Sequence, residues 1–559
     1  MAAVYRNILD HIWTPLAGVA VTFVLALSVV AQTPTPSPTI DLPPPVQPSF
    51  VSAPRPTPDP SRVGVDGGDP WSLTIEQAID LALTNNNDID VSRNNVRIND
   101  YNLQAAKGIY DPLFSSQTYY ESRTTPTAST IGGAVGGSVT QRQFYNDFGF
   151  SGFTPKFGGQ YDLLFNQART TTTNRNTTLN PQYPTNMIAS YTQPLWRGLR
   201  IDANRRNIMI AAKNVSITES QLRQVAMTQI RSVEQAYWDL VYALRNLQVQ
   251  NDTLRQAQDQ LESNKRLVEK GVLAPIEVVA ANAQISTYEQ AIYAAQESVT
   301  RDENTLKTIL LPDRRAPEWS RPIMPVTDMN REVPRIGLEV ATSEAMKNRP
   351  EIEQLGISKD INQIDQRYYK DLTKPQVNLV GSYTSAGLAG TPNPNSSGFA
   401  TVPDVLKGGY FNSLRNLYAQ DFPTYRLGVQ IALPIRNRTA KANFARVQVE
   451  GDRIANNRAQ EEQLIEAEVR NALQALRSAE ATLASATAAR EAAEELYSSE
   501  QRQFRAGTTT FFLVLQRQTE LSAARGREIQ ARTNLNKAIS EFNHSIGATL
   551  NVNNVSVGK

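Results

Sequence analysis

The chain has 559 residues, enough for several domains, and carries 56 basic against 54 acidic residues. A formal net charge of +2 gives no reason to expect nucleic acid as a partner. The absence of cysteine excludes disulfides, thiolate metal sites, a cysteine nucleophile and a lipidated N-terminal cysteine, and with only two histidines most zinc and general-base chemistry lacks its usual side chain.

The N-terminal segment is predicted to direct export. Residues 16–31 form an uncharged run that is short for a membrane span but typical of a signal peptide, and Val29-Val30-Ala31 offers a cleavage site. We therefore predict a signal peptide over 1–31, with a retained anchor helix as the alternative. Residues 32–70 hold 12 of the 32 prolines and are predicted to form an extended, disordered linker.

Folded structure is predicted from Trp71 onward. Ser72 or Thr74 is a suitable N-cap for a helix that ends near residue 82, and a second helix is predicted over 88–107. Pro112 ends that helix. Aromatic-rich segments with an alternation of apolar and polar residues then predict strands over 113–121, 143–153, 160–168 and 187–193. A tight turn over 155–159 and polar segments over 123–140 and 170–184 separate these strands.

A very long helix is predicted to follow, because no proline occurs between Trp196 and Gly271. Some 68 helical residues would span roughly 100 Å, and Gly271 would end the helix before a return helix over 276–310. Apolar residues recur at spacings of four and three, as in a coiled coil. The apolar positions of this seam are Ala226, Ile230, Val233, Tyr237, Leu240, Leu244 and Leu247.

The second half of the chain repeats these features in the same order. Helices are predicted over 337–347 and 351–369, strands near 377–383 and 425–433, a long helix over 440–506, and a return helix over 511–546 after Gly507. Matching landmarks in one order indicate a duplicated unit. We predict a first repeat over 71–312, a linker over 313–335, a second repeat over 336–550, and a C-terminal tail over 551–559.

Motifs for catalysis are missing. The glycine-rich segment 132–137 precedes a polar, strand-like stretch rather than a helix, so it is not a phosphate-binding loop. His544 lies in the last predicted helix without an evident acidic partner, and the adjacent carboxylates Glu461-Glu462 are neighbours on a solvated helix. The sequence therefore predicts a protein that is not an enzyme and that has no cofactor and no metal site.

The remaining features indicate a membrane conduit. The predicted helices are too polar to span a bilayer, so the strands would have to do so, and only a closed barrel satisfies strand backbones in lipid. One chain has too few strands to close a pore, so several chains would share one barrel, with the helices continuing it as a tube.

The chain resembles the TolC-like outer-membrane efflux protein family over about residues 71–550. The resemblance rests on YTQPLWRG and QIALPIRN at the strand-to-helix junctions, and on RLVEKGVLAPIEVVAANAQ and RQFRAGTTTFFLVLQRQTE at the helix turns. It implies a mixed α and β fold: a homotrimer with an outer-membrane β-barrel, continued through the periplasm by a long coiled-coil α-helical barrel. It also implies a passive channel component of a tripartite efflux pump or type I secretion system.

The resemblance further implies partners and contact residues. The partners would be a periplasmic adaptor protein, an inner-membrane transporter or ABC ATPase reached through that adaptor, and outer-membrane lipid. Family members often carry aspartates six and nine residues beyond the second tip glycine, where this chain has Leu513 and Gln516. We therefore expect a constriction at Leu513, Gln516 and Arg517 without an acidic ring. The adaptor-contacting hairpin tips would be Gly271, Val272, Leu273, Gly507, Thr508 and Thr509.

Two alternatives stay open from the sequence. The family usually contributes four strands per protomer, whereas six candidates here predict an eighteen-stranded shared barrel with loops 123–142, 169–186 and 387–422 outside. The alternative keeps four spanning strands and folds 141–170 as an external or rim hairpin. In function, the alternative is an exported coiled-coil scaffold or a periplasmic adaptor-like protein without a pore.

Overall fold

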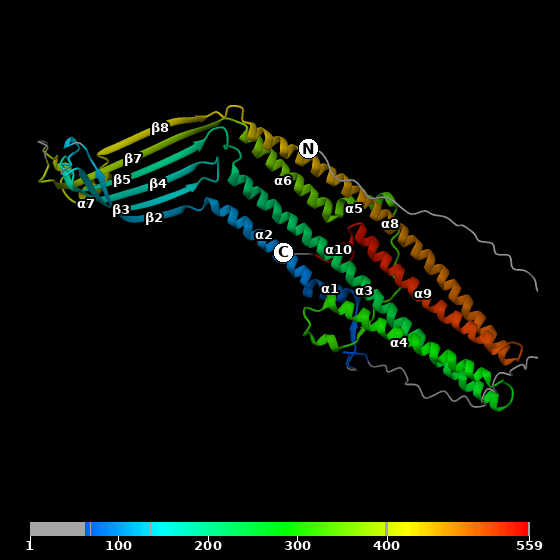
Figure 1. Cartoon of the computed structure of the whole chain (residues 1–559). Coiled ribbons are helices and arrows are strands. Elements are labelled where there is room, and N and C mark those ends of the chain that lie inside the picture. The colour runs from blue at the N-terminus through cyan, green and yellow to red at the C-terminus, as the bar shows by residue number, and fades with distance from the viewer. Residues whose placement is uncertain (1–61, 67–68, 129, 135, 397–400, 557–559) are drawn as a thin grey trace, which may run out of the picture. The chain divides into compact units, whose positions relative to one another are not determined.

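A computed structural model describes residues 62–66, 69–128, 130–134, 136–396 and 401–556. The predicted signal peptide and residues 32–61 of the predicted linker lie outside the described residues. Figure 1 shows antiparallel strands side by side in one sheet and long helices packed against one another. Within the part of the chain that is described, no helix is both long and apolar enough to cross a membrane.

The first half of the described chain alternates between helices and strands in the predicted order. Thr74 caps the first helix, since its hydroxyl accepts from the Gln77 amide at 3.2 Å while the Gln77 side chain accepts from the Thr74 amide at 3.1 Å. The elements are β1 (Trp71–Leu73), α1 (Ile75–Asn85), α2 (Asn87–Lys107), β2 (Leu113–Pro126), β3 (Ser138–Phe153), β4 (Gln160–Thr172), β5 (Leu179–Pro194), α3 (Ala203–Glu269) and α4 (Ile276–Leu310).

The second half has the same alternation, with fewer strands and two additional short helices. Pro350 is the first residue of its helix, where its missing N–H costs no hydrogen bond. The elements are β6 (Ile323–Pro325), α5 (Leu338–Asn348), α6 (Pro350–Leu372), β7 (Gln376–Pro392), α7 (Tyr410–Ala419), β8 (Phe422–Ala432), α8 (Arg438–Arg505), α9 (Phe511–Ser545) and α10 (Thr549–Val552).

All six predicted strands form, and they lie in one sheet in the order β2-β3-β4-β5-β7-β8. Every neighbouring pair is antiparallel. The strands are longer than predicted: β2, β3, β4 and β5 take up parts of the segments 123–140 and 170–184, which were expected to be loops. Threonine and asparagine, which are common in these segments, pair across the ladder in spite of their polarity, as Thr124 does with Thr140.

The expectation that residues 387–422 form one polar loop is wrong. β7 continues to Pro392, and α7 occupies Tyr410–Ala419 and packs on the sheet.

Parts of the predicted linker and of the predicted C-terminal tail contact the folded chain. Residues 62–66 of the expected linker are fixed by the Asp66 amide, which donates to the Ser320 carbonyl at 2.8 Å, and Val555 of the expected tail packs on the core around α3.

The core around the middle of α3 confirms the predicted apolar seam. Ala226, Ile230, Val233, Tyr237 and Leu240 are at most 1% exposed. Residues of α1, α4 and β6 complete this core, and β1 pairs with β6 beside it. A second core forms where α8 and α9 meet α5 and α6. The two halves of the described chain therefore build similar helical cores.

Candidate functional site

One face of the six-stranded sheet is apolar across every strand. Since alternate side chains of a strand point to opposite faces, the register defines rows of side chains. One row is Phe114, Phe150, Leu163, Ala189, Tyr383 and Tyr425. The row one residue away, on the opposite face, is Leu113, Ser151, Asp162, Ser190, Ser382 and Arg426. We call the first side the apolar face and the other side the polar face.

The apolar face and both sheet edges are exposed in the single chain. Phe114 is 64% exposed, Tyr425 74% and Leu427 80%. β2 and β8 form the two edges of the sheet, so each presents one row of backbone groups without a partner strand. An extended exposed apolar surface of this kind marks a contact with lipid or with another protein.

The two hairpin tips are built in the same way. Gly271 has φ 72° and Gly507 has φ 75°, a left-handed conformation that favours glycine. At the first tip the Val272 amide donates to the Leu267 carbonyl at 2.9 Å; at the second the Thr508 amide donates to the Gln503 carbonyl at 3.1 Å. These bonds form Schellman motifs, which end α3 and α8 and allow α4 and α9 to return. Around the glycines, Val272 and Thr508 are exposed and Leu273 and Thr509 half-buried.

Replacing Gly271 or Gly507 by alanine is expected to lower the free energy of unfolding of the hairpin by about 1–2 kcal/mol, because a side chain at positive φ strains the turn. Gly356 is a control: it lies inside α6, its φ is not positive, and apart from its chain neighbours and the backbone of its own helix no atom lies within 4 Å of an added Cβ. Gly356→Ala should be neutral or slightly stabilising. Thermal unfolding followed by circular dichroism would compare the three variants, and equal melting temperatures would contradict the expectation.

The residues expected to form the constriction lie near the start of α9. Leu513 is half-buried, Gln516 is exposed, and Arg517 donates to the Glu520 carboxylate at 2.7 Å. The Gln516 side chain donates to the same carboxylate at 3.0 Å. The hydrogen bond from Arg517 lowers the pKa of Glu520 below its usual value, with a further contribution from Gln516. The charge of Arg517 is therefore balanced within its own helix.

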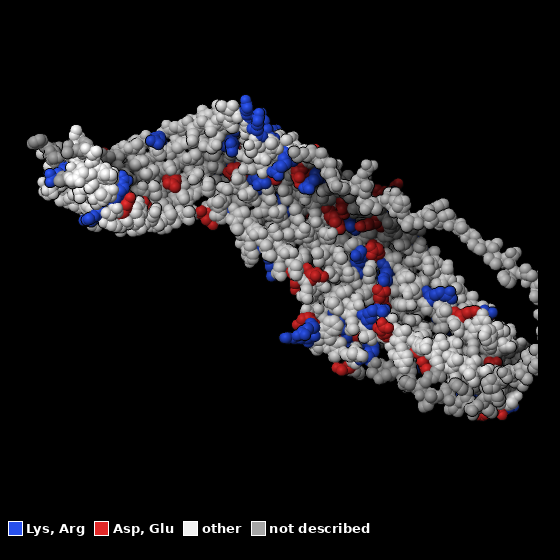
Figure 2. Space-filling view, in the orientation of Figure 1, with Lys and Arg blue, Asp and Glu red and all other residues white. Residues whose placement is uncertain are grey.

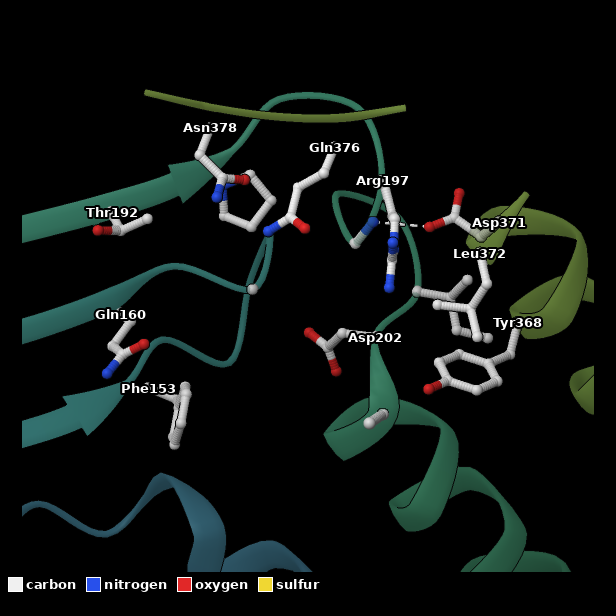
Figure 3. A pocket seen from close by; sticks show the side chains of 15 residues that line it. Phe153, Gln160, Thr192, Arg197, Asp202, Tyr368, Asp371, Leu372, Gln376 and Asn378 are labelled. Carbon is white, nitrogen blue, oxygen red and sulfur yellow. Dashed lines mark hydrogen bonds between the residues drawn. The ribbon is translucent and has the colours of Figure 1, made fainter. Parts of the chain in front are cut away.

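A cavity of about 300 Å³ lies where the sheet meets the helices. Figure 3 shows strand-end residues such as Gln160 and Asn378 on one side of it and Tyr368 and Asp371 of α6 on the other. The buried Asp371 accepts from the Gly198 amide at 2.6 Å and from Lys374 at 2.6 Å. These bonds fasten the YTQPLWRG junction to α6. The role of Asp371 in this junction was not predicted from the sequence. Its partner Gly198 stands out there as the only glycine between Trp196 and Gly271.

Groups for metal or acid–base chemistry are sparse. Among the described residues, no cluster of three or more His, Cys, Asp and Glu side chains could hold a metal ion. His544 is half-buried in α9. Burial, together with the positive charges of Arg231 and Arg349, lowers the pKa of His544 from 6.5 to about 4. The imidazole is therefore neutral at physiological pH.

The stability of the folded chain should consequently fall in mild acid. Below pH 6.5, His544 of the unfolded chain binds a proton that His544 of the folded chain does not. The stability that the neutral, buried imidazole contributes is therefore complete above pH 6.5 and is lost as the pH falls towards 4. The loss should approach roughly 3 kcal/mol. His544→Gln should flatten the dependence of the melting temperature on pH in this range. Parallel pH profiles for the two proteins would contradict this assignment.

The chain belongs to the outer membrane efflux protein family, whose model matches residues 152–310 and 341–548, more than half of its length. The resemblance inferred from the sequence is thereby confirmed. Membership locates the protein in the outer membrane, with its helical part in the periplasm.

Solved outer-membrane proteins share the fold. CmeC of Campylobacter jejuni is 15% identical, with a TM-score of 0.59 over 85% of this chain and 86% of its own. The open state of MtrE of Neisseria gonorrhoeae is 15% identical, with a TM-score of 0.56 over 85% and 89%. VceC of Vibrio cholerae is 13% identical, with a TM-score of 0.56 over 85% and 96%. Among curated proteins, none matches the sequence significantly.

Proposed function

We propose that three copies of this chain form one passive conduit from the periplasm to the exterior, as the outer-membrane component of a tripartite efflux pump or type I secretion system. The observation that carries the proposal is the apolar row that crosses all six strands. A face of this composition is suited to lipid, and the polar face is suited to a water-filled lumen. Catalysis has no part in the proposed function.

The two free edges of the sheet support assembly with further copies. An open sheet cannot remain in hydrocarbon, because the backbone groups of its edges would lack partners. Pairing β8 of one copy with β2 of the next satisfies both edges without a new element. Three copies with six strands each would form an eighteen-stranded barrel, and an even number of that size is usual for outer-membrane pores.

The hairpin tips would contact the periplasmic adaptor. The Gly271 and Gly507 turns have the same hydrogen bonds, and three copies would present six of them. The exposed Val272 and Thr508 are the contact residues we propose, and the inner-membrane transporter or ABC ATPase would be reached through the adaptor. An exported scaffold or adaptor-like protein without a pore is not favoured, because the matched family is that of outer membrane efflux proteins.

Cysteine cross-linking between the edge strands tests the trimeric barrel. The chain has no native cysteine, so each introduced pair is the only one present. A series would combine Thr118→Cys in β2 with a cysteine at each position from 424 to 431 in β8. Within one copy these strands are the opposite edges of a six-stranded sheet, roughly 24 Å apart at 4.8 Å per strand, so a disulfide can form only between copies.

The expected result is a ladder of disulfide-linked species that ends at the trimer, for pairs in one register only. Each single-cysteine variant is the matched control and should yield no such ladder. Failure of the whole series to cross-link would overturn the shared barrel. A ladder that continues beyond three copies would overturn the trimer.

Divalent cations are expected to block the proposed channel only weakly from its periplasmic side. Leu513 and Gln516 provide no carboxylate, and Glu520 is engaged by Arg517. Single-channel recordings with added Ca²⁺ would measure the block. The double variant Leu513→Asp/Gln516→Asp is a positive control, because it adds two carboxylates per copy and should create a cation site. Strong block of the unaltered channel at micromolar Ca²⁺ would contradict the proposed constriction.

A further inference from the structure

α7 turns two polar residues towards the sheet and two large aromatic residues, Phe411 and Tyr418, outward. Ser413, Asn416 and Leu417 are buried, whereas Phe411 is 81% exposed and Tyr418 is 72% exposed. Positions 411, 415 and 418 lie on one side of a helix, so Arg415 shares the outer side with the two rings. A helix that faces water has the opposite pattern, with its apolar side covered.

Specific contacts hold α7 in this orientation. The Ser413 and Thr185 hydroxyls are 2.8 Å apart, and the Ser385 hydroxyl donates to the Leu417 carbonyl at 2.6 Å. The Asn416 amide group donates to the Leu388 carbonyl at 2.9 Å and to the Val405 carbonyl at 2.8 Å. The polar side of α7 is therefore bonded to the protein, and its aromatic side is left facing outward.

α7 packs on the apolar face of the sheet, and we call this contact site on the sheet the seat. Thr185, Ser385 and Gly387 continue, at alternate positions, the side of β5 and β7 that carries Met187 and Tyr383. At this end of the face the side chains become small. A Cβ added to Gly387 would lie 2.2 Å from the Ser413 carbonyl oxygen, so only glycine lets the helix approach this closely.

Aromatic and basic residues surround the seat. On the same face, Arg169 of β4 pairs in register with Phe144 of β3, which is 49% exposed, and the hydroxyl of Tyr410 bonds to Gln167. Figure 2 shows a few separate Lys and Arg side chains, with an acidic side chain beside them, at the end of the sheet where α7 lies. An apolar band that ends in aromatic and then basic side chains is typical of the border between acyl chains and headgroups.

We propose that α7 is an interfacial helix of the outer leaflet, with Phe411 and Tyr418 inserted at the top of the acyl chains and Arg415 in contact with anionic headgroups. The inference rests on the proposed function, because the apolar face must meet lipid. A second copy of the chain does not fit this place. α7 packs on β7 and β5, which are inner strands of the sheet, whereas a neighbouring copy would pair at β2 and β8.

Spin labelling tests the proposal in the full-length protein reconstituted in phosphatidylcholine–phosphatidylglycerol vesicles. Single cysteines replace Phe411 or Tyr418 in the naturally cysteine-free chain, and power saturation compares access of oxygen, which enters lipid, with access of a water-soluble nickel chelate. Leu427→Cys on the apolar face of β8 is the lipid reference, and Asn395→Cys, at an exposed position beyond β7, is the water reference.

Labels at 411 and 418 should show an oxygen-to-nickel ratio severalfold above that of Asn395→Cys and close to that of Leu427→Cys. A water-like ratio at both sites with a lipid-like Leu427→Cys would overturn the role of α7 alone. Exclusion of both reagents would also overturn it, since it would indicate a protein partner. A water-like ratio at Leu427→Cys itself would overturn the membrane wall, and with it the proposed function.

A second pair of variants tests the seat. Gly387→Val should displace α7 and lower the oxygen-to-nickel ratio of a label at 411 towards the water reference. Gly381→Val is the matched control: it lies on the same face of β7, and the nearest atom to its added Cβ is 3.9 Å away. An unchanged ratio in Gly387→Val would overturn the seating of α7 inferred here.

Discussion

Replacing Leu240 by aspartate is expected to abolish the folded protein. Leu240 is 0% exposed in the core that α3 forms with α1, α4 and β6. The variant loses the burial of a leucine and places a carboxylate among apolar side chains, at a combined cost of roughly 5 kcal/mol or more. That cost is comparable to the whole stability of many domains. Outer-membrane yield and the melting temperature of the purified protein would measure the effect.

Asn251→Asp is the matched control for this prediction. It introduces a carboxylate at an exposed position of the same helix, so yield and melting temperature should change little. If Leu240→Asp accumulated and melted like the unaltered protein, the assignment of the apolar seam to a packed core would be wrong.

Lys307→Met is expected to lower the free energy of unfolding by about 3–5 kcal/mol, because it removes one partner of a buried ion pair. The Lys307 ammonium lies 2.7 Å from the Glu303 carboxylate and donates to the Trp319 carbonyl at 2.7 Å. The two side chains are 0% and 1% exposed. In the variant, the buried Glu303 keeps its bond to Arg62, at 2.7 Å, but loses its nearest compensating charge within α4.

An exposed ion pair offers the comparison. Lys213 lies 2.7 Å from Asp360, with side chains that are 39% and 48% exposed, so Lys213→Met should cost less than about 1 kcal/mol. The double variant Glu303→Leu/Lys307→Met should recover part of the stability that Lys307→Met loses. Chemical unfolding followed by tryptophan fluorescence would rank the three variants, and equal losses for Lys213→Met and Lys307→Met would refute the argument from burial.

The helical part could be predicted closely because its signals are local. The return helix after Gly271 has the predicted bounds, Ile276–Leu310, and the seam residues are buried where the spacing indicated. Each of the two turns depends on one glycine with positive φ, and a glycine at the end of a long helical segment is visible in the sequence. The six strands were also predictable, since each has alternating apolar and polar residues.

Contacts between distant segments were not predictable. α7 buries Ser413 and Asn416 and exposes Phe411. The spacing of its apolar residues therefore does not predict which side of the helix contacts the sheet. The junction bond between Gly198 and Asp371 joins residues 173 positions apart, and nothing near either residue indicates the other. The strand extensions depend on cross-strand pairing of polar residues, which a single strand does not reveal.

Conductance across a planar lipid bilayer tests the central claim, a shared pore, most directly. The purified protein should insert and produce discrete, long-lived current steps. Arg517→Ala, which breaks a hydrogen bond within α9 and leaves Gln516 bonded to Glu520, should conduct as well as the unaltered protein. The contradicting result is a bilayer that remains silent with both proteins, while protease protection shows that both have inserted.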